Sequence, residues 1–261
     1  MRIRIAAPVL AGALALAAAA APTAAFAATA KPVITGISSP SATIGLGGKV
    51  TLGVTVTAKD AAGVRSIMAE PYPLALAKAE GLVPTAAEVR SSTDNLLTAR
   101  SATATTLTAS HLETDSYTRS ELPPNALAGA WGVAVLVTAK DGSTTFSVQA
   151  TTFYWRRADT LSAKVSATKV AKGAGLTVKG QLNRVNWDAE AYQGYGSQQV
   201  RLEFRRTGGT TWSTVELVRS GATGALSTTV KDTAGGSWRY VFDGNSTSSY
   251  AASTQTWVGL K

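Results

Sequence analysis

The 261-residue sequence contains no cysteine and a single histidine, His111. Without cysteine the chain has no disulfide, no lipid-modified cysteine and no thiolate ligand for a metal. A zinc site usually combines several His and Cys ligands, so one histidine argues against zinc. After the first thirty residues there is also no long apolar run, so we expect no membrane span in the mature chain. The sequence therefore predicts neither a metal nor a cofactor.

The first thirty residues have the pattern of an export signal. Arg2 and Arg4 form a positive start, an apolar stretch follows from Ile5 to Ala21, and Ala25-Phe26-Ala27 has the small-x-small pattern of a signal-peptidase site. We expect cleavage after Ala27, which makes residues 1–27 a signal peptide. The mature protein is then expected to be secreted, either extracellular or loosely associated with the cell wall.

Positive charge exceeds negative charge, but it is dispersed along the chain. The formal net charge is +9, which falls to +7 when Arg2 and Arg4 leave with the signal. Only Arg156-Arg157 and Arg205-Arg206 are adjacent basic pairs, and no nucleic-acid-binding motif accompanies them. We therefore expect no nucleic acid as a partner. An anionic cell-wall polymer or another extracellular protein is the expected partner, and a purely solubilising role for the charge remains the alternative.

Nearly the same ten residues occur twice, as VTVTAKDAAG from residue 54 and as VLVTAKDGST from residue 135. In both copies apolar side chains occupy every second position, which predicts half-buried strands. Asp141-Gly142 then predicts a tight hairpin turn. The apolar positions change parity between Val148 and Phe153, which predicts a β-bulge near Thr151.

The second half of the chain continues this strand pattern. Glycine-containing turns separate seven short segments, of which Val200/Leu202/Phe204 and Trp238/Tyr240/Phe242 alternate most clearly. This spacing is typical of an immunoglobulin-like β-sandwich, with a barrel as the main structural rival. The seven predicted strands are Leu161–Val170, Leu176–Arg184, Val200–Arg206, Thr211–Val218, Leu226–Lys231, Trp238–Phe242 and Ser253–Leu260.

The first half predicts a less regular sandwich. We expect one short helix between Leu74 and Glu80, a strand around Leu107, and a polar loop from His111 to Asn125. The pattern breaks at RRADT, residues 156–160, so the sequence predicts an all-β protein of two tandem immunoglobulin-like β-sandwich domains. The first domain covers residues 28–157, with an irregular insertion, and the second covers residues 158–261. So short a connection predicts little swing between them.

The best candidate binding site is the segment NWDAEAYQGYGSQQ, residues 186–199. Trp187, Tyr192 and Tyr195 lie there among polar residues, and exposed aromatic faces beside amides and carboxylates could bind a sugar ring. The alternative is that these rings plug the open end of a sandwich. Four other tryptophans are expected to pack within strands, namely Trp131, Trp155, Trp238 and Trp257.

Candidates for catalysis and for calcium are weaker. His111 lies near Glu113 and Asp115, but no motif marks a Ser or Cys nucleophile. We therefore expect no catalytic residues and no enzyme. Four aspartates could serve calcium, but they lie in separate connections without alternating acidic spacing, and those in turns are expected to bond their own backbone. These aspartates are Asp60, Asp141, Asp188 and Asp243.

Three segments resemble exported actinobacterial proteins made of tandem immunoglobulin-like modules, whose function is largely uncharacterised. The segments are residues 134–158, 176–205 and 236–253. The resemblance implies a non-catalytic scaffold or interaction module of the cell envelope or medium. The alternative is a polysaccharide- or calcium-binding module that uses loops of the second domain, because some of these proteins carry a generic calcium-binding label.

Overall fold

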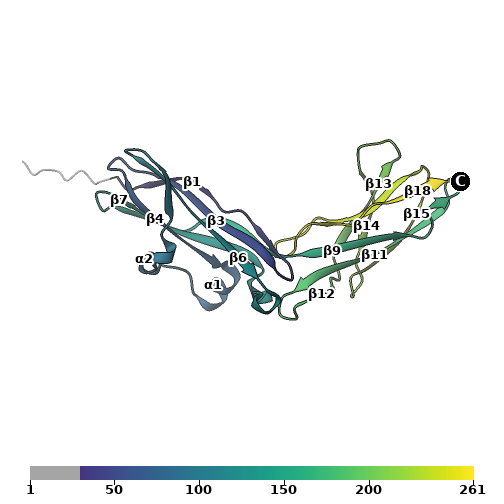
Figure 1. Ribbon diagram of the computed structural model, residues 1–261, viewed down its shortest axis with the longest axis horizontal. Helices are drawn as coiled ribbons and strands as arrows, with labels where there is room; N and C mark the ends of the chain where they lie inside the picture. Colours follow the sequence, from purple (N-terminus) through teal and green to yellow (C-terminus); the bar gives the residue numbers. More distant parts are fainter. Residues whose placement is uncertain (1–29) are drawn as a thin grey trace, which may run out of the picture.

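The computed structural model describes residues 30–261, without the side chains of residues 113–117. The expected signal peptide, residues 1–27, lies outside the described part. Figure 1 shows two β-rich units arranged end to end in an elongated molecule. Within the described residues, no helix has the length and apolar character needed to cross a membrane.

The first unit is a sandwich of two four-stranded sheets. One sheet has the order β1-β3-β6-β5, with β1 at Val33–Ser38, β3 at Gly48–Lys59, β6 at Thr106–Tyr117 and β5 at Thr98–Ala102. The other has the order β2-β8-β7-β4, with β2 at Ala42–Ile44, β8 at Thr144–Arg157, β7 at Gly129–Ala139 and β4 at Val64–Pro73.

The two copies of the repeated ten residues lie in opposite sheets of this sandwich. The first copy belongs to β3, whose buried and less buried positions alternate as expected. The second copy belongs to β7, which is buried on both faces. Val133, Val135 and Val137 enter the core between the sheets, whereas Ala134 and Leu136 join a separate apolar cluster on the other side. The same repeated residues therefore form a half-buried strand in β3 and a strand that is buried on both faces in β7.

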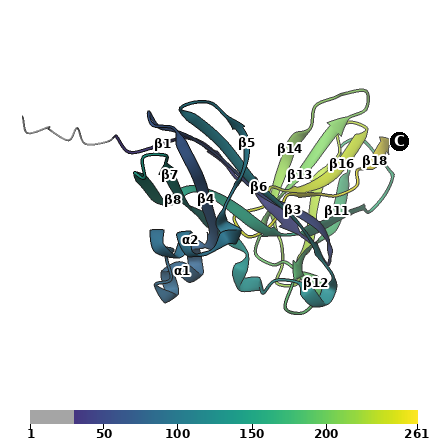
Figure 2. The same cartoon turned by 60° about the vertical axis from the view of Figure 1, so that its left-hand side comes forward.

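Two short helices provide the second cover of β7. The helix α1 spans Leu74–Glu80, as predicted, and ends at Gly81 in the left-handed conformation. The helix α2 spans Ala86–Ser91 and was not predicted, although Thr85 and Glu88 form a capping box that announces its start. Figure 2 shows both helices next to β4, on the outside of the sheet.

The first unit contains the predicted turn at Asp141-Gly142 and the predicted bulge near Thr151, but not the whole of the predicted loop from His111. The turn at Asp141-Gly142 is confirmed, with Gly142 at φ 89° and the Ser143 amide donating to the Asp141 carboxylate at 2.9 Å. The bulge is also confirmed, because the β7–β8 register shifts next to Thr151. The expected polar loop from His111 is wrong over its first part, since β6 pairs with β3 through Tyr117. There the long antiparallel ladder outweighs the Ser/Thr-rich composition.

The second unit is also built from two sheets. The six-stranded sheet contains β10 (Lys169–Val170), β18 (Thr256–Leu260), β16 (Gly236–Phe242), β13 (Gln199–Arg206) and β14 (Ser213–Arg219) in that order, with β17 (Ala251–Ala252) paired to β16. The other sheet centres on β11 (Gly175–Asn186), which pairs with β12 (Ala191–Gly194), β15 (Ala225–Lys231) and β9 (Asp159–Val165).

The core of the second unit lies between these sheets. Leu202 and Tyr240 are fully buried there, as the alternation of their strands predicts. The Tyr240 hydroxyl donates to the Val178 carbonyl of the facing sheet at 2.9 Å, and this contact satisfies its buried polar group. Gly180 lies against the ring of Tyr240, because a Cβ at that position would come within 2.9 Å of it. The chain is thus an all-β protein of immunoglobulin-like sandwiches.

Candidate functional site

The predicted site residue Trp187 lies in the joint between the two sandwiches. It follows β11 of the second sandwich, yet its ring belongs to the core of the first, and only 2% of the residue is exposed. Its indole Nε1 donates to the Ile44 carbonyl at 3.1 Å. A ring buried in this way offers no face to a sugar, so the expectation of an exposed stacking residue is wrong for Trp187. The ring acts as a plug, but in the neighbouring sandwich.

Tyr192 and Tyr195 do not complete a shared platform. Tyr192 is 38% exposed, and its hydroxyl lies beside Gly45 of the first sandwich. Burial is the main cause that raises its pKa. Tyr195 is half-buried, with the Arg184 guanidinium 3.8 Å from its ring centroid. Its hydroxyl accepts a hydrogen bond from Asn245 at 2.9 Å. Tyr192 therefore lies at the joint, whereas Tyr195 packs against the core of the second sandwich.

Asn125 is the centre of the hydrogen bonds across the joint. It starts a 3-10 turn of the first unit, η3 (Asn125–Leu127). Its Nδ2 donates to Asn186 Oδ1 at 2.5 Å and to Asp188 Oδ2 at 2.6 Å. Its Oδ1 accepts from the Trp187 amide at 3.0 Å and from Arg157 at 2.9 Å. One amide side chain is thus saturated by partners on two segments, residues 186–188 and Arg157.

The covalent connection itself is held by backbone hydrogen bonds on both sides. Ala158 donates to the Ile44 carbonyl at 3.0 Å and accepts from Val185 at 2.9 Å. Arg157 exchanges backbone hydrogen bonds with Thr247 and Ser249, each at 3.0 Å. A connection whose amides and carbonyls are already paired has little freedom to rotate. The short tether predicted from RRADT is therefore also a tightly bonded one.

A half-buried carboxyl group, Asp159, lies at the start of β9 beside this connection. Its Oδ2 accepts from the Ser249 amide at 2.8 Å, whereas its Oδ1 is buried without a hydrogen-bond partner. Burial raises the pKa of Asp159 to about 7, although the Ser249 hydrogen bonds and the nearby Arg184 and Arg157 act in the opposite direction. Burial also disfavours the charged form of Arg157 and therefore lowers its pKa. The joint thus contains a carboxyl group that changes charge near neutral pH.

His111 lies on β6 and not in a loop. It borders an open hollow of about 400 Å³ together with Asp94 and Asn95. The Asn95 amide nitrogen donates to Glu70 at 3.2 Å, which fixes that wall of the hollow. Glu113 and Asp115, the other members of the acid/base cluster considered from the sequence, have side chains outside the described part. Among the described residues of this hollow, no side chain provides a Ser or Cys nucleophile.

The four aspartates considered for calcium are engaged in different parts of the molecule. Asp60 and Asp141 accept hydrogen bonds from the amides two residues ahead, at 2.7 and 2.9 Å, so the turn role is confirmed for both. Asp188 bonds to Asn125 in the joint. Asp243 pairs with Arg201 through both oxygens, at 3.0 and 2.6 Å. In the part of the chain that the structure describes, no three acidic, His or Cys groups cluster as metal ligands would.

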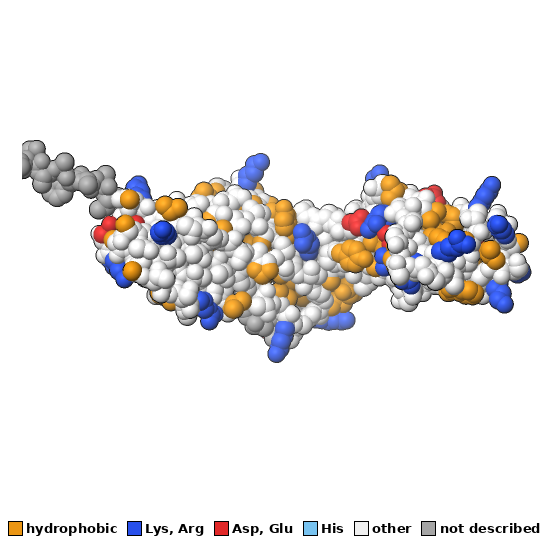
Figure 3. All heavy atoms as spheres, turned by 90° about the horizontal axis from the view of Figure 1, so that it is seen from above, with side chains coloured by type: hydrophobic (Ala, Val, Ile, Leu, Met, Phe, Trp, Pro, Cys, Tyr) orange, Lys and Arg blue, Asp and Glu red, His pale blue; other side chains and the backbone are white. Residues whose placement is uncertain are grey.

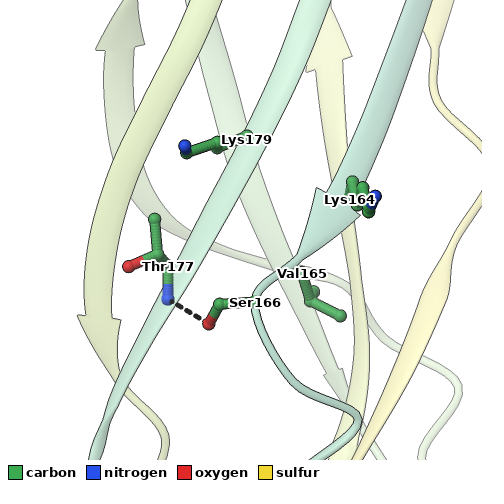
Figure 4. A pocket seen from close by; sticks show the side chains of 5 residues that line it. All are labelled: Lys164, Val165, Ser166, Thr177 and Lys179. Atoms are coloured by element: carbon green, nitrogen blue, oxygen red, sulfur yellow. Dashed lines mark hydrogen bonds between the residues drawn. The ribbon is translucent and has the colours of Figure 1, made fainter.

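An open hollow of about 290 Å³ also lies on the outer surface of the sheet centred on β11. Figure 4 shows Lys164 and Lys179 at its rim and the hydrogen bond of 3.1 Å from the Thr177 amide to Ser166 Oγ. Its polar lining residues are exposed or half-buried, and none of them is a buried polar group that points into the hollow. This surface is basic, but it has no feature that selects a ligand.

Among the four tryptophans expected to pack within strands, the structure confirms three. Trp131, Trp155 and Trp238 are buried. Trp257 is the exception, because 51% of the residue is exposed on β18. Its neighbours Val258 and Leu260 face the core, so the alternation of the strand places Trp257 on the outer face.

Comparisons with known proteins add little to this geometry. No protein-family profile and no curated protein matches the sequence. Among solved structures, the fibronectin(III)-like modules of Clostridium thermocellum CbhA are similar over 88% of this chain and 92% of theirs, with a TM-score of 0.40 and 13% identity. The Yersinia pseudotuberculosis adhesin InvE is similar over 85% of this chain and 58% of its own, with a TM-score of 0.28 and 13% identity. Likenesses this weak do not indicate what the chain binds.

Proposed function

We propose that the protein is an exported, non-catalytic spacer of two immunoglobulin-like domains that acts as a scaffold or interaction module in the cell envelope or medium. The observation that carries this proposal is the filled joint, where Trp187 of the second sandwich is buried in the core of the first. A spacer must hold its two ends at a defined separation, and a buried ring with saturated hydrogen bonds around Asn125 does so.

The export part of the proposal rests on the sequence of residues 1–27, and the placement among exported actinobacterial tandem-module proteins rests on the three resembling segments. Mass spectrometry of culture medium tests the export directly. The expected product is a chain that begins at Ala28. Recovery of the uncleaved chain in membranes alone would contradict both the secretion and the spacer role.

The absence of cysteine makes the rigidity of the joint easy to measure. We would introduce Lys49→Cys on the first sandwich and Lys164→Cys on the second, attach spin labels, and measure the distance distribution by double electron–electron resonance. Both lysines are exposed, so the labels do not disturb a core. A rigid spacer gives one narrow distance distribution.

A matched variant tests whether the joint causes the rigidity. Asn125→Ala combined with Asp188→Ala removes the bonds from Asn125 to Asp188, Asn186, Trp187 and Arg157. The labelled pair should then show a broader distribution, while circular dichroism keeps its β-type spectrum. A broad distribution in the unaltered joint would overturn the spacer proposal.

The alternative function is a polysaccharide- or calcium-binding module that uses loops of the second domain. The loop of residues 186–199 no longer favours it, because Trp187 is buried in the joint. A polysaccharide surface on that domain would therefore have to lie elsewhere than on this loop.

A further inference from the structure

The outer face of the six-stranded sheet carries an aromatic and basic surface that the joint does not use. On β13, Leu202 and Phe204 face the core, so Arg201, Glu203 and Arg205 alternate to the outside. On β18 the same alternation places Trp257 outside. On the face of the second sandwich seen in Figure 3, hydrophobic and basic side chains lie next to one another.

Trp257 lies flat on this face. A Cβ built on Gly259 would lie 2.5 Å from Cη2 and 3.0 Å from Cζ3 of the indole. The ring therefore lies against the backbone at Gly259, two residues along the same strand, where any larger residue would lift it. Its Nε1 donates to Thr207 Oγ1 at 3.2 Å, which fixes the orientation of the ring. One indole face is thus held against the sheet while 51% of the residue remains exposed.

Arg205 lies beside Trp257 on the same row of the sheet. Both residues are paired with Ser237, from opposite sides of β16, so their Cα atoms are about 10 Å apart, two strand spacings. Arg205 donates to the Gln255 side chain at 2.7 Å, and its guanidinium lies 4.7 Å from the centroid of Trp212. The guanidinium thus lies over Trp212, and its N–H groups that do not bond Gln255 remain available to a ligand.

The charge of Arg205 is uncompensated, unlike that of its neighbours. Glu203, which is 4% exposed, bonds both Arg201 and Arg239, and Arg201 also pairs with Asp243. Within the described residues, no carboxylate forms a salt bridge with Arg205. The two carboxylates Glu203 and Asp243 thus balance the charges of Arg201 and Arg239, which leaves Arg205 as one oriented cation next to a flat, exposed indole.

We propose that Trp257 and Arg205 form a binding surface for an acidic polysaccharide, in which a sugar ring stacks on the indole and a carboxylate pairs with the guanidinium. The indole supplies an apolar stacking face, and Arg205 can bind a carboxylate through two N–H groups. Ser237, Thr207 and Gln255 supply hydroxyl and amide groups around the ring, which suit sugar hydroxyls. A neutral polymer would leave Arg205 unused, so charge complementarity favours an acidic one.

This inference rests on the proposed role as an envelope interaction module, and it names the ligand class of that module. The proposed binding surface is distinct from the loop of residues 186–199, because it lies on the outer face of the six-stranded sheet. The two surfaces are built by different elements, since Trp257 and Arg205 lie on β18 and β13 whereas Trp187 follows β11. Binding and rigidity can therefore be tested independently.

Isothermal titration calorimetry of the mature full-length protein with polygalacturonate tests the surface. We expect measurable binding that weakens at least tenfold in Trp257→Ala and in Arg205→Gln. Gly259→Ala is the sharpest variant, because it keeps both side chains and only lifts the indole from the sheet. It should weaken binding to a similar extent. Trp257→Phe, which keeps a smaller stacking face, should weaken binding less than Trp257→Ala.

The matched control removes two charges from the opposite sheet face, in Lys164→Gln combined with Lys179→Gln. These exposed lysines border the hollow of Figure 4, and their loss should leave binding unchanged. An equal loss in this control would mean unspecific attraction to a basic protein and would overturn the proposal. The absence of polygalacturonate binding to the unaltered protein would overturn it as well.

Two further ligands separate the alternatives. Polygalacturonate with its carboxylates reduced to alcohols should bind at least tenfold more weakly, and equal binding would remove the role of Arg205. Single-stranded DNA that bound more tightly through the same residues would replace the polysaccharide by a nucleic acid. The spin-label distances across the joint do not depend on any of these results. A narrow distribution without polysaccharide binding would therefore sink this inference and leave the spacer proposal intact.

Discussion

The two sandwiches differ in how they complete their cores. The core of the second consists of residues from its own part of the chain, between Leu161 and Leu260. The core of the first also contains Val185 and Trp187, which are contributed by the second. The dependence therefore runs in one direction. The first sandwich loses the burial of Trp187 when the second sandwich is removed. The core of the second sandwich does not contain Trp187 and keeps its own packing.

The largest expected effect is on the isolated halves of the chain. A fragment of residues 159–261 should melt cooperatively and give a β-type circular dichroism spectrum, because its core is complete. A fragment of residues 28–157 lacks Trp187 and should be less stable than the same domain within the full chain by about 3 kcal/mol or more. Urea denaturation measures both. Equal stability of the first domain with and without its neighbour would show that the borrowed ring contributes nothing.

Trp187→Ala should reproduce this loss within the full chain. Removing a buried tryptophan typically costs about 3 to 5 kcal/mol, and here the loss should lower the unfolding transition of the first sandwich. Trp257→Ala is the matched control and should cost clearly less, because 51% of Trp257 is exposed on a sheet face. If the two variants had equal effects on the urea midpoint, the difference in burial between the two rings would have no energetic meaning.

Leu202→Ala probes the second core in the same way. Leu202 is fully buried between the sheets of the second sandwich, and its truncation should cost about 2 to 5 kcal/mol. Phe204→Ala should cost less, because Phe204 is only partly buried at the edge of this core. Both variants should leave the transition of the first sandwich in place. Loss of the first transition in Leu202→Ala would mean that the sandwiches unfold as one unit.

The joint should respond to pH through Asp159. Its pKa is raised from 3.8 to about 7 in the folded protein, so the folded state binds a proton that the unfolded state releases between these values. The free energy of unfolding should therefore fall as pH rises from about 4 to 7, and this contribution should stay constant above 7.

Asp159→Asn provides the reference for this measurement, because it keeps a neutral side chain of similar shape at every pH. The difference in urea midpoint between the two proteins should widen from pH 4 to pH 7, because the midpoint of the unaltered protein falls relative to that of Asp159→Asn. A difference that does not vary with pH would show that Asp159 keeps an ordinary pKa.

Local signals predicted most strands and the helix α1, because alternation and turn residues act over a few positions. The sequence allowed Trp187 to be buried as a plug at a sandwich end. It did not indicate that the ring would enter the other sandwich, where its Nε1 bonds the carbonyl of Ile44, 143 residues away. No local pattern encodes such a distant contact. Trp257 was assigned to packing because half the positions of a strand face a core. The usable signals were the alternation with Val258 and Leu260, which face the core, and Gly259, which leaves room for a ring two residues earlier.

The smallest expected effect is that of calcium, for which we predict none. The four candidate aspartates divide between the sandwiches and the joint, and each already accepts hydrogen bonds through at least one oxygen, from turn amides, from Asn125 or from Arg201. A calcium ion needs six to eight oxygens around convergent charges, and the described residues contain no such cluster.

Thermal melts of the mature protein in millimolar calcium and in chelator should therefore coincide. A bound ion would add about 2.7 kcal/mol at a hundred times its dissociation constant, which a melt of a domain this size resolves as several degrees. The informative region is the pair Asp243 and Arg201, because binding there would require the ion to displace a bidentate guanidinium. A calcium-dependent rise in melting temperature that disappears in Asp243→Asn would identify the connection after β16, which contains Asp243, as a metal site and would contradict the prediction.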